Sequence, residues 1–523
     1  MEPKTSSPSR ASSAASPVAV IDIGTTSIRM AIGEISEDGG VRTLESLSQA
    51  VSLGMDTFAE RRIGKATIEN CVRVLKSYRK ILQEYDITEP ERIRVVATSA
   101  VREATNRLAF VDRIYIATNF QVEPIDEAEV NRVTYLGVQP YLRAQAFAGI
   151  RTIVTEVGGG STELLLVHDG NVLLADTYRL GSLRLRKSLE GYSASPEKVR
   201  RIMENQIQRM VEEVRQNVPA EGEVNMIGLG GDMRFAAGHL LPDWQPGQLT
   251  RTPVAALEAF TTHLIGLSDD RIVNRYHLSF PEAETVGPAL LTYVMLAQAF
   301  ALDDVLITDT NLRDGLLQEM AVGQSWTREF RQQIVRSALK LGAKYNFDET
   351  HARHVAMLAS QLFEQLRDEH QLDSRHEVLL HVAALLHEIG AYVSNRAMHK
   401  HSMYLIRNSE VFGLGKRFLL LVALVARYHR RASPQPNHEG YAVLNREERV
   451  AVSKMAAMLR VAVALDESRS QRIRAFTCGT EDYRLVISIP QAEDLSLEQL
   501  ALKQTGSMFE EVFGLRVLLR VTQ

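Results

Sequence analysis

Two segments of the chain, residues 18–35 and 152–167, share one pattern, and this repetition limits the folds that the chain can adopt. Each has an apolar run ending in an acid, then one aliphatic residue, a glycine and a turn rich in hydroxyl groups, before a second apolar run. This order predicts a strand, a tight turn and an antiparallel strand. Helical and strand patterns alternate between and after the two copies. The sequence therefore predicts a duplicated α/β fold with two lobes around a cleft.

The two predicted turns carry groups that bind phosphate. Glycine lets the backbone come close to a ligand and offer its N–H groups, hydroxyl groups add donors, and the acids Asp22 and Glu156 can hold a hydrated metal ion. We therefore predict a phosphate site formed by residues 20–29 and 154–163, with chemistry at a phosphoryl group. For each turn alone, a glycine-rich hairpin without a ligand stays open. The predicted phosphate-binding residues are Gly24, Thr25, Thr26, Ser27, Gly158, Gly159, Gly160, Ser161 and Thr162.

Two well-known phosphate-binding loops are excluded. No Gly-Lys-Ser/Thr follows either turn, and neither turn fits the GxGxxG pattern in a βαβ unit. A weaker signal lies in residues 225–238, where a predicted strand breaks into a glycine-rich turn before a helix. This turn, with Gly228, Gly230 and Gly231, is a candidate nucleotide-side loop.

Composition restricts partners and location. The net charge of −4 over 523 residues excludes an overall basic surface, so a polyanion would need locally concentrated cations. Cys71 and Cys478 cannot form a zinc quartet, and we favour a reducing cytoplasm over a disulfide between them. The first 17 residues lack the apolar run of a signal peptide. The longest apolar stretch, residues 418–426, is shorter than the ~20 residues of a membrane helix.

From about residue 326 the pattern becomes helical, because apolar residues recur at spacings of three and four. The end of the chain predicts two strands around a helix. We expect a disordered tail in residues 1–17, lobes in residues 18–135 and 136–322, a helical domain in residues 323–475 and a small α+β cap in residues 476–523.

Strings along most of the chain carry a resemblance to a known family. The most specific are EVGGGSTE, which starts at Glu156, and HEIG, HKHS and RYHRR in the C-terminal half; others are IDIGTTSIRM, VATSAVREATN, IDEAEV, RLGSLRL, GLGGDMR and TDTNLRDGLL. Together they resemble the exopolyphosphatase and guanosine-pentaphosphate phosphohydrolase (Ppx/GppA) family. The resemblance covers residues 18–523 and implies an actin-like, sugar-kinase-like duplicated fold.

The resemblance also implies an activity and the residues that perform it. The expected reaction is release of the terminal phosphate of inorganic polyphosphate, with guanosine pentaphosphate as the alternative substrate. The general base falls on Glu127, a phosphate-neutralising cation on Arg102, and the catalytic and metal-binding acids on Asp22, Glu156 and Glu163. Mg²⁺ is the implied cofactor, with a monovalent cation such as K⁺ as a second. A homodimer is implied, and neither nucleic acid nor a membrane is expected as a partner.

Some positions depart from the family pattern. Glu156 stands where Asp is usual, and its extra methylene group predicts a displaced metal ion, which matters because a misplacement of about 1 Å can lower a rate by two orders of magnitude. Residues 25–27 read Thr-Thr-Ser in place of Ser-Asn-Ser, and residues 230–232 read Gly-Gly-Asp in place of Ser-Gly-Thr. Arg29 stands where the family varies.

The helical region resembles a metal-dependent HD phosphohydrolase domain, with ligands at His354, the His387-Glu388 doublet and Asp466. An active HD enzyme has His-Asp in the doublet, so we predict no second activity. A zincin is excluded because Ala391 replaces the second histidine of HExxH. We expect this domain to lengthen the cleft for a polyanion, with ordinary solvated helix-end charges as the alternative. The candidate polyanion-binding residues are His399, Lys400, His401, Arg427, His429, Arg430 and Arg431.

Two other functions stay open. The DIGTTS string and the chain length suit a carbohydrate-type kinase, although the helical domain and the predicted base argue against it. A non-catalytic sensor that binds polyphosphate or an alarmone is the other alternative, because Glu156 would mark a damaged metal site.

Overall fold

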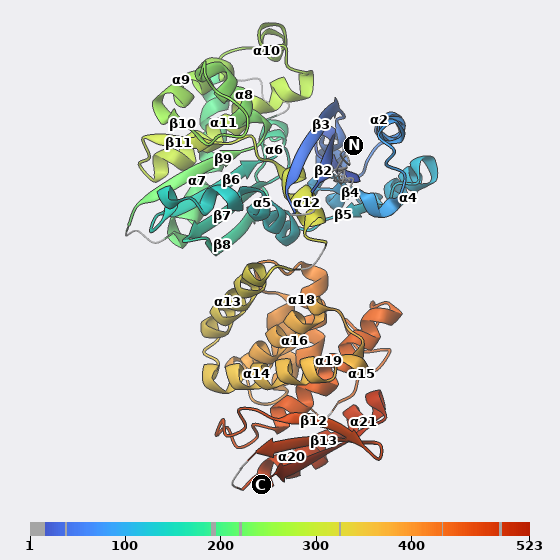
Figure 1. Ribbon diagram of the computed structural model, residues 1–523. Helices are drawn as coiled ribbons and strands as arrows, with labels where there is room; N and C mark the ends of the chain where they lie inside the picture. The colour runs from blue at the N-terminus through green and yellow to red at the C-terminus, as the bar shows by residue number, and fades with distance from the viewer. Residues whose placement is uncertain are drawn as a thin grey trace, which may run out of the picture. The chain divides into compact units, whose positions relative to one another are not determined.

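The chain forms two compact units, Met1–Gln324 and Ser325–Gln523, in the computed structural model (Figure 1). No helix in the described part of the chain is both long and apolar enough to cross a membrane. The predicted tail mostly lies outside the described residues, and its last two residues already belong to a strand that begins at Ser16. The structure describes residues 16–36, 39–189, 195–218, 222–323, 326–430, 432–490 and 494–522.

A five-stranded sheet in the order β3-β2-β1-β4-β5 forms the first lobe. Strand β1 pairs antiparallel with β2 and parallel with β4, so it lies in the middle of the sheet and its apolar run is buried. The strands are β1 (Ser16–Ile23), β2 (Ser27–Ile35), β3 (Val41–Ala50), β4 (Ile93–Ala97) and β5 (Val122–Pro124). The helices are α1 (Leu53–Glu60), α2 (Lys65–Glu84), η1 (Pro90–Arg92), α3 (Ser99–Glu103), α4 (Arg107–Thr118) and α5 (Glu127–Leu142).

The second lobe repeats this topology. Its sheet has the order β10-β11-β9-β6-β7-β8, so that β8-β7-β6-β9-β11 matches the first sheet strand for strand and β10 is an added antiparallel edge. The predicted duplication is therefore confirmed. The strands are β6 (Arg151–Val157), β7 (Thr162–His168), β8 (Asn171–Tyr178), β9 (Val224–Leu229), β10 (Thr250–Pro253) and β11 (Asp304–Ile307). The helices are η2 (Gln145–Phe147), α6 (Ser182–Lys187), α7 (Pro196–Asn217), α8 (Gly231–Leu240), α9 (Val254–Ile265), α10 (Asp269–Tyr276), α11 (Phe280–Ala299) and α12 (Leu312–Ala321).

Helices α5 and α12 join the two lobes. Helix α5 ends the first lobe but contacts β7 and β8, whereas α12 ends the second lobe and contacts β1 and β2. The helices lie so close together that a Cβ atom on Gly315 would stand 2.1 Å from the Val133 carbonyl oxygen. The expected boundary between residues 135 and 136 thus falls inside α5, a helix that both lobes share.

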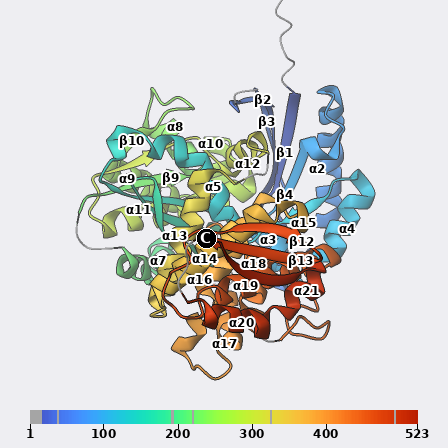
Figure 2. The same ribbon diagram turned by 60° about the horizontal axis from the view of Figure 1, so that its bottom comes forward.

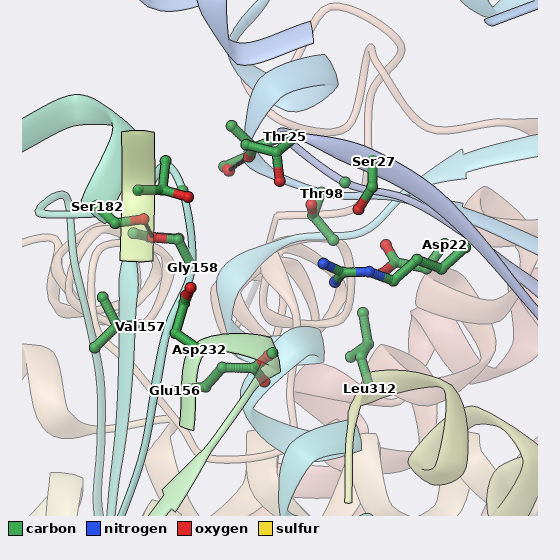
Figure 3. A pocket seen from close by; sticks show the side chains of 18 of the residues that line it. Asp22, Thr25, Ser27, Thr98, Glu156, Val157, Gly158, Ser182, Asp232 and Leu312 are labelled. Carbon is green, nitrogen blue, oxygen red and sulfur yellow. Dashed lines mark hydrogen bonds between the residues drawn. The ribbon is translucent and has the colours of Figure 1, made fainter. Parts of the chain in front are cut away.

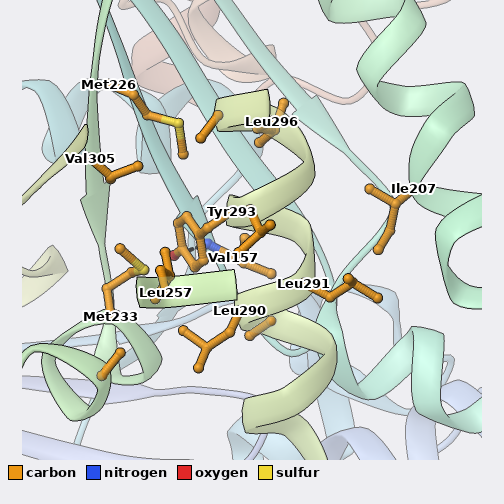
Figure 4. Close-up of a cluster of buried hydrophobic side chains, with 14 of the residues drawn as sticks. Val157, Ile207, Met226, Met233, Leu257, Leu290, Leu291, Tyr293, Leu296 and Val305 are labelled. Carbon is orange, nitrogen blue, oxygen red and sulfur yellow. Dashed lines mark hydrogen bonds between the residues drawn. The ribbon is translucent and has the colours of Figure 1, made fainter. Parts of the chain in front are cut away.

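Helix α11 forms the centre of the second lobe's core (Figure 4). Thirteen of its residues are buried, which suits a helix covered on most sides. Among its apolar side chains stands Tyr293, whose hydroxyl accepts a hydrogen bond from the Val157 N–H at 2.7 Å and donates one to the Leu229 carbonyl at 2.5 Å. Tyr293 therefore joins the ends of β6 and β9, the strands that lead into the second predicted phosphate-binding turn and into the candidate nucleotide-side loop.

The second unit is helical and ends in a small sheet (Figure 2). The sheet has three strands in the order β12-β13-β14, with two helices between β13 and β14, so the predicted two strands around one helix were one strand and one helix short. Cys478 in β12, like Cys71 in α2, is a free thiol. The elements are α13 (Arg328–Lys344), α14 (Glu349–Gln365), α15 (Arg367–His370), α16 (Ser374–Leu386), η3 (Ile389–Tyr392), α17 (Met398–Arg407), α18 (Lys416–Arg427), α19 (Arg446–Ala464), β12 (Thr477–Glu481), β13 (Arg484–Pro490), α20 (Ser496–Thr505), α21 (Ser507–Phe513) and β14 (Arg516–Thr522).

Candidate active site

A pocket of about 170 Å³ opens between the two lobes, and both predicted turns line it. Figure 3 shows Asp22 and Ser27 on one side and Glu156, Gly158 and Ser182 on the other. The lining comes from Asp22, residues 24–27, Arg29, Thr98, Ser99, Arg102, Val130, residues 156–159, Ser161, Glu163, Ser182, Gly231, Asp232, Phe235, Leu278, Glu282, Thr285, Val286 and Leu312.

The two turns have the same geometry. In the first, the Gly24 N–H donates to the Ser27 carbonyl at 3.0 Å, and in the second the Gly158 N–H donates to the Ser161 carbonyl at 2.8 Å. A Cβ atom on Gly159 would stand 2.8 Å from Thr25 Cγ2, so the turns approach each other closely and glycine is needed there. Two glycine turns thus face each other across the pocket, as the sequence predicted for a two-sided site.

The three predicted acids stand at the ends of paired strands. Asp22 is buried at the end of β1, and its Oδ1 atom has no hydrogen-bond partner among the described residues. Burial raises the pKa of Asp22, while the charges of Arg313 and Arg29 oppose the shift. Glu163 accepts a hydrogen bond from the Ser161 hydroxyl at 2.6 Å, and burial raises its pKa to about 7. Burial also raises the pKa of Glu156, against the charges of Arg234 and Arg29.

Asp22, Glu156 and Glu163 do not form a compact metal cage. Among the described residues, they are not a group with three ligand atoms within 4.8 Å of one another. The reason is that Asp22 belongs to the first lobe and the two glutamates to the second. The unpartnered Asp22 oxygen nevertheless fits a hydrated Mg²⁺, which takes one or two carboxylates and keeps waters or substrate phosphates as its other ligands.

Three arginines for which we predicted no individual role, Arg29, Arg234 and Arg313, act on these acids with their charges. Arg313 at the start of α12 is buried, with Nη1 3.8 Å from Asp22 Oδ2. Arg234 donates from Nη1 to the Asp309 carbonyl at 3.4 Å, and its charge, like that of Arg29, lowers the pKa of Glu156. A role in the site could have been suspected for each. Arg29 is a lone arginine in the apolar strand β2, and Arg234 and Arg313 lie near the start of helices that follow a strand. Arg29 lines the pocket, whereas Arg234 and Arg313 do not, so the motifs missed positive charge both in the pocket and behind its acids.

Arg102 and Glu127 lie together at the edge of the pocket. Arg102 lines it, and its Nη1 donates to the Ile125 carbonyl at 3.0 Å while Nη2 stands 3.4 Å from Glu127 Oε1. Glu127 is the first residue of α5, after the N-cap Asp126. Its side chain is 36% exposed and does not line the pocket itself, whereas Val130, one turn further along α5, does. The predicted base is thus adjacent to the pocket and is held by the predicted cation.

The candidate nucleotide-side loop joins β9 to α8. Gly230 has φ +96°, a conformation that favours glycine, and a Cβ atom there would stand 3.4 Å from Glu156. Asp232 follows in the first turn of α8 and lines the pocket, and burial raises its pKa to about 6. Gly231 lines the pocket as well, whereas Gly228 is part of β9.

The candidate polyanion-binding residues of the helical unit differ in their surroundings. Lys400 and Arg430 are exposed, while His399, His401 and Arg427 are half-buried. His429 is buried, its Nδ1 lies 2.6 Å from the Ala426 carbonyl, and burial holds its pKa well below the usual range. His429 is therefore neutral at pH 7 and cannot supply the positive charge that we predicted. Arg431 lies outside the described residues.

The HD-like ligand set also differs from the prediction. His351, and not His354, forms a group with His387 and Glu388 in which the ligand atoms lie within 4.8 Å of one another. Asp466 accepts a hydrogen bond from His351, whereas His354 Nε2 stands 3.9 Å from the Asp466 carboxylate. The structure thus places His351, and not the predicted His354, beside the doublet; the two histidines lie three residues apart on α14, so the sequence pattern did not separate them.

Comparisons with known proteins agree with this architecture. The model of the Ppx/GppA phosphatase family matches residues 34–323, and that of Ppx/GppA phosphatase domain III matches residues 334–505. The guanosine-5'-triphosphate,3'-diphosphate pyrophosphatase of Aeromonas hydrophila is 25% identical over 479 residues, 90% of this chain and 92% of that protein. Its counterpart in Photobacterium profundum is 22% identical over 506 residues, 93% and 96% of the two chains.

A solved structure, described as an exopolyphosphatase from Cytophaga hutchinsonii, is 22% identical, with a TM-score of 0.53 over 59% of this chain and 98% of that one. The duplicated sheets and the shared helices define an actin-like two-lobe α/β protein that continues into a helical domain. More particularly, the chain belongs to the Ppx/GppA phosphatase family, whose members are phosphoanhydride hydrolases.

Proposed function

We propose that the chain removes the terminal phosphate of guanosine 5'-triphosphate 3'-diphosphate by attack of water in the cleft between its lobes. The observation that carries this proposal is the pair of facing glycine turns, with acids from both lobes and the first-lobe arginines Arg29 and Arg102 around them. The nucleotide substrate is supported by the two pyrophosphatases that are similar over 90% and 93% of this chain. This order reverses the expectation from the sequence, which put polyphosphate first.

The two turns would hold the terminal phosphate from both sides. Residues 24–27, Gly158, Gly159 and Ser161 line the pocket with backbone and hydroxyl groups, whereas the predicted Gly160 and Thr162 do not line it and the Thr162 hydroxyl donates to the Leu180 carbonyl. Arg29, Arg234 and Arg313 offset the charge of the remaining phosphates, which matters because the chain as a whole is acidic. In phosphoryl transfer, positioning and charge stabilisation account for most of the catalysis.

Glu127 would accept the proton of the attacking water. One P–O bond forms to that water, the bridging P–O bond breaks, and the products are inorganic phosphate and guanosine 5'-diphosphate 3'-diphosphate. Arg102 has two parts in this step, because it orients Glu127 at 3.4 Å and faces the pocket where charge develops on the phosphate oxygens.

Asp22, Glu156 and Glu163 would hold Mg²⁺. When bound, the ion would offset charge on the phosphate oxygens. Because the acids approach from two lobes, closure of the lobes on the substrate would bring them nearer. Glu156 adds a methylene group on the second-lobe side, and the Glu156→Asp variant tests whether this length is tuned to the substrate.

The experiment compares two substrates. With Mg²⁺ present, kcat/KM for phosphate release is measured for guanosine 5'-triphosphate 3'-diphosphate and for long-chain polyphosphate. We expect release from both and a higher kcat/KM for the nucleotide. Release from neither substrate contradicts the hydrolase, and tight binding without release supports the sensor.

A second candidate function is exopolyphosphatase. It is favoured by the likeness of the fold to the structure described as the Cytophaga hutchinsonii exopolyphosphatase and by the exposed cations Lys400 and Arg430 in the helical unit. A higher kcat/KM for polyphosphate in the same assay would put this candidate first.

A further inference from the structure

The helical unit contains a group of side chains that the proposed reaction does not use. Ligand atoms of His351, His387 and Glu388 lie within 4.8 Å of one another, and in the described part of the chain this is the only group of three or more. His351 comes from α14, and His387 and Glu388 directly follow α16, two helices that pack together (Figure 1). Both histidines are buried, and the Glu388 side chain is 22% exposed.

Each histidine has its Nδ1 atom engaged by an oxygen acceptor. His387 Nδ1 lies 2.7 Å from the Ala384 carbonyl, so this nitrogen carries the proton and Nε2 carries the lone pair. His387 Nε2 has no hydrogen-bond partner among the described residues, although the residue is 0% exposed. A buried polar atom without a partner is costly, and an unseen ligand would satisfy it.

His351 is oriented in the same way by a carboxylate. Its Nδ1 lies 2.8 Å from Asp466 Oδ2, and Asp466 also accepts hydrogen bonds from the Gln471 backbone N–H at 2.9 Å and side-chain amide at 3.3 Å. A carboxylate or carbonyl on one ring nitrogen is the usual support of a histidine that binds metal through the other. Both histidines therefore have the support that metal-binding histidines have.

A cavity of about 410 Å³ adjoins Glu388. It is lined by Tyr345, Asn346, Phe347, Asp348, Glu388, Ala391, Asn395, Met398, Arg430 and Arg469. With three protein ligands, a tetrahedral ion would have one position left for water or a small anion from this cavity. The site is thus open on one side.

We propose that the helical unit binds one divalent transition-metal ion, of which zinc is the type, through His351 Nε2, His387 Nε2 and a carboxylate oxygen of Glu388. Two imidazoles and a carboxylate select such an ion over Mg²⁺, which prefers oxygen ligands. The proposal does not rest on the hydrolase proposed above, because every residue in it lies in the second unit.

Arg469 competes for the carboxylate. Its Nη2 donates to Glu388 at 2.9 and 2.7 Å, and its Nη1 donates to Asp348 at 3.0 Å. A guanidinium there offsets the Glu388 charge and opposes a second cation nearby. The metal must displace part of this ion pair, so removal of Arg469 strengthens metal binding while removal of the Glu388 charge weakens it.

The test measures zinc bound to the full chain by equilibrium dialysis in excess Mg²⁺, which occupies oxygen-ligand sites. We expect one zinc ion per chain in the wild type. The Glu388→Gln variant should bind zinc at least about tenfold more weakly, and the Arg469→Gln variant several-fold more tightly. Neither side chain is fully buried, and an unfolded variant could not show tighter binding.

His399→Gln is the matched control. His399 lies in the same unit and also has a buried nitrogen without a partner, but it belongs to no group of three ligand atoms among the described residues. Its zinc binding should equal that of the wild type, whereas His387→Ala should lose the bound ion. The proposal is overturned if the wild type binds no zinc, if His387→Ala keeps it, or if Glu388→Gln and Arg469→Gln do not change the affinity in opposite directions.

Discussion

The cleft of the first unit and the histidine group of the second both set charged or polar side chains around a cavity, but they arrange them differently. In the cleft, acids from two lobes stand near Arg29, which lines the pocket, and feel the charges of Arg234 and Arg313. In the helical unit, ligand atoms of two imidazoles and one carboxylate converge within 4.8 Å of one another. Spread acids and arginines suit a large anion that arrives with its hydrated cation, whereas converging ligands suit a bare cation. The difference indicates that the cleft suits a phosphate anion and the histidine group a metal cation.

The largest expected effect is that of Arg102→Met, which tests whether the cleft binds a phosphate anion. The guanidinium lines the pocket and holds Glu127, so its loss should lower kcat for phosphate release by roughly 10²–10³-fold. Arg113→Met is the control, because Arg113 forms an exposed pair with Glu69 in the same lobe. Equal rates for the two variants would remove Arg102 from the site.

Arg313→Met asks whether the cleft depends on internal charge balance. Arg313 Nη1 stands 3.8 Å from the buried Asp22 carboxylate, so its removal should lower the free energy of unfolding by roughly 3 kcal/mol. Adding Asp22→Asn should restore part of the loss, because the uncompensated charge then disappears. Urea denaturation of both single variants and the double variant measures this coupling. Strict additivity would show that the two charges do not interact.

Tyr293→Phe tests whether the hydrogen bonds of the Tyr293 hydroxyl hold the ends of β6 and β9 in place beside the cleft. The change leaves the Val157 N–H without its partner and should cost about 1–2 kcal/mol in urea denaturation. Because Val157 precedes the Gly158 turn, KM for the substrate should rise as well. Thr292→Val is the control, because the Thr292 hydroxyl donates to the Pro288 carbonyl within the same helix. A stability loss with unchanged KM would confine Tyr293 to the core.

The smallest expected effect is the pH dependence of stability that comes from His381 in the helical unit. Burial holds the pKa of His381 at about 4, below the ~6.5 of an unfolded chain. Between these values the unfolded chain binds a proton that the folded chain does not, so stability falls as the pH drops from about 6.5 to about 4. At pH 5.5 the loss from this group is about 1 kcal/mol. Thermal unfolding of His381→Gln should depend less on pH over this range, and an unchanged dependence would contradict the assignment.

The duplicated strand-turn-strand units of the fold could be predicted from the sequence, because the residues that signal them are neighbours in the chain. The motifs Asp22-Ile-Gly24 and Glu156-Val-Gly158 predicted two strand-turn-strand units, and the structure has both turns. Tyr293 could not be found in this way, since a tyrosine in a buried helix resembles any core residue until its partners on β6 and β9 are known. The choice of His351 over His354 likewise depends on the rotation of α14 toward α16, which spacing alone does not fix.

The account's central claim is that Glu127 activates water in the cleft, and one measurement tests it most directly. Phosphate release is followed in ¹⁸O-labelled water for the wild type, Glu127→Gln and the control Glu123→Gln, whose carboxylate is exposed in the same lobe. The account predicts one water oxygen in each released phosphate, and a rate lower by about 10²–10⁴-fold for Glu127→Gln alone. Released phosphate without water oxygen, or an undiminished rate for Glu127→Gln, would contradict it.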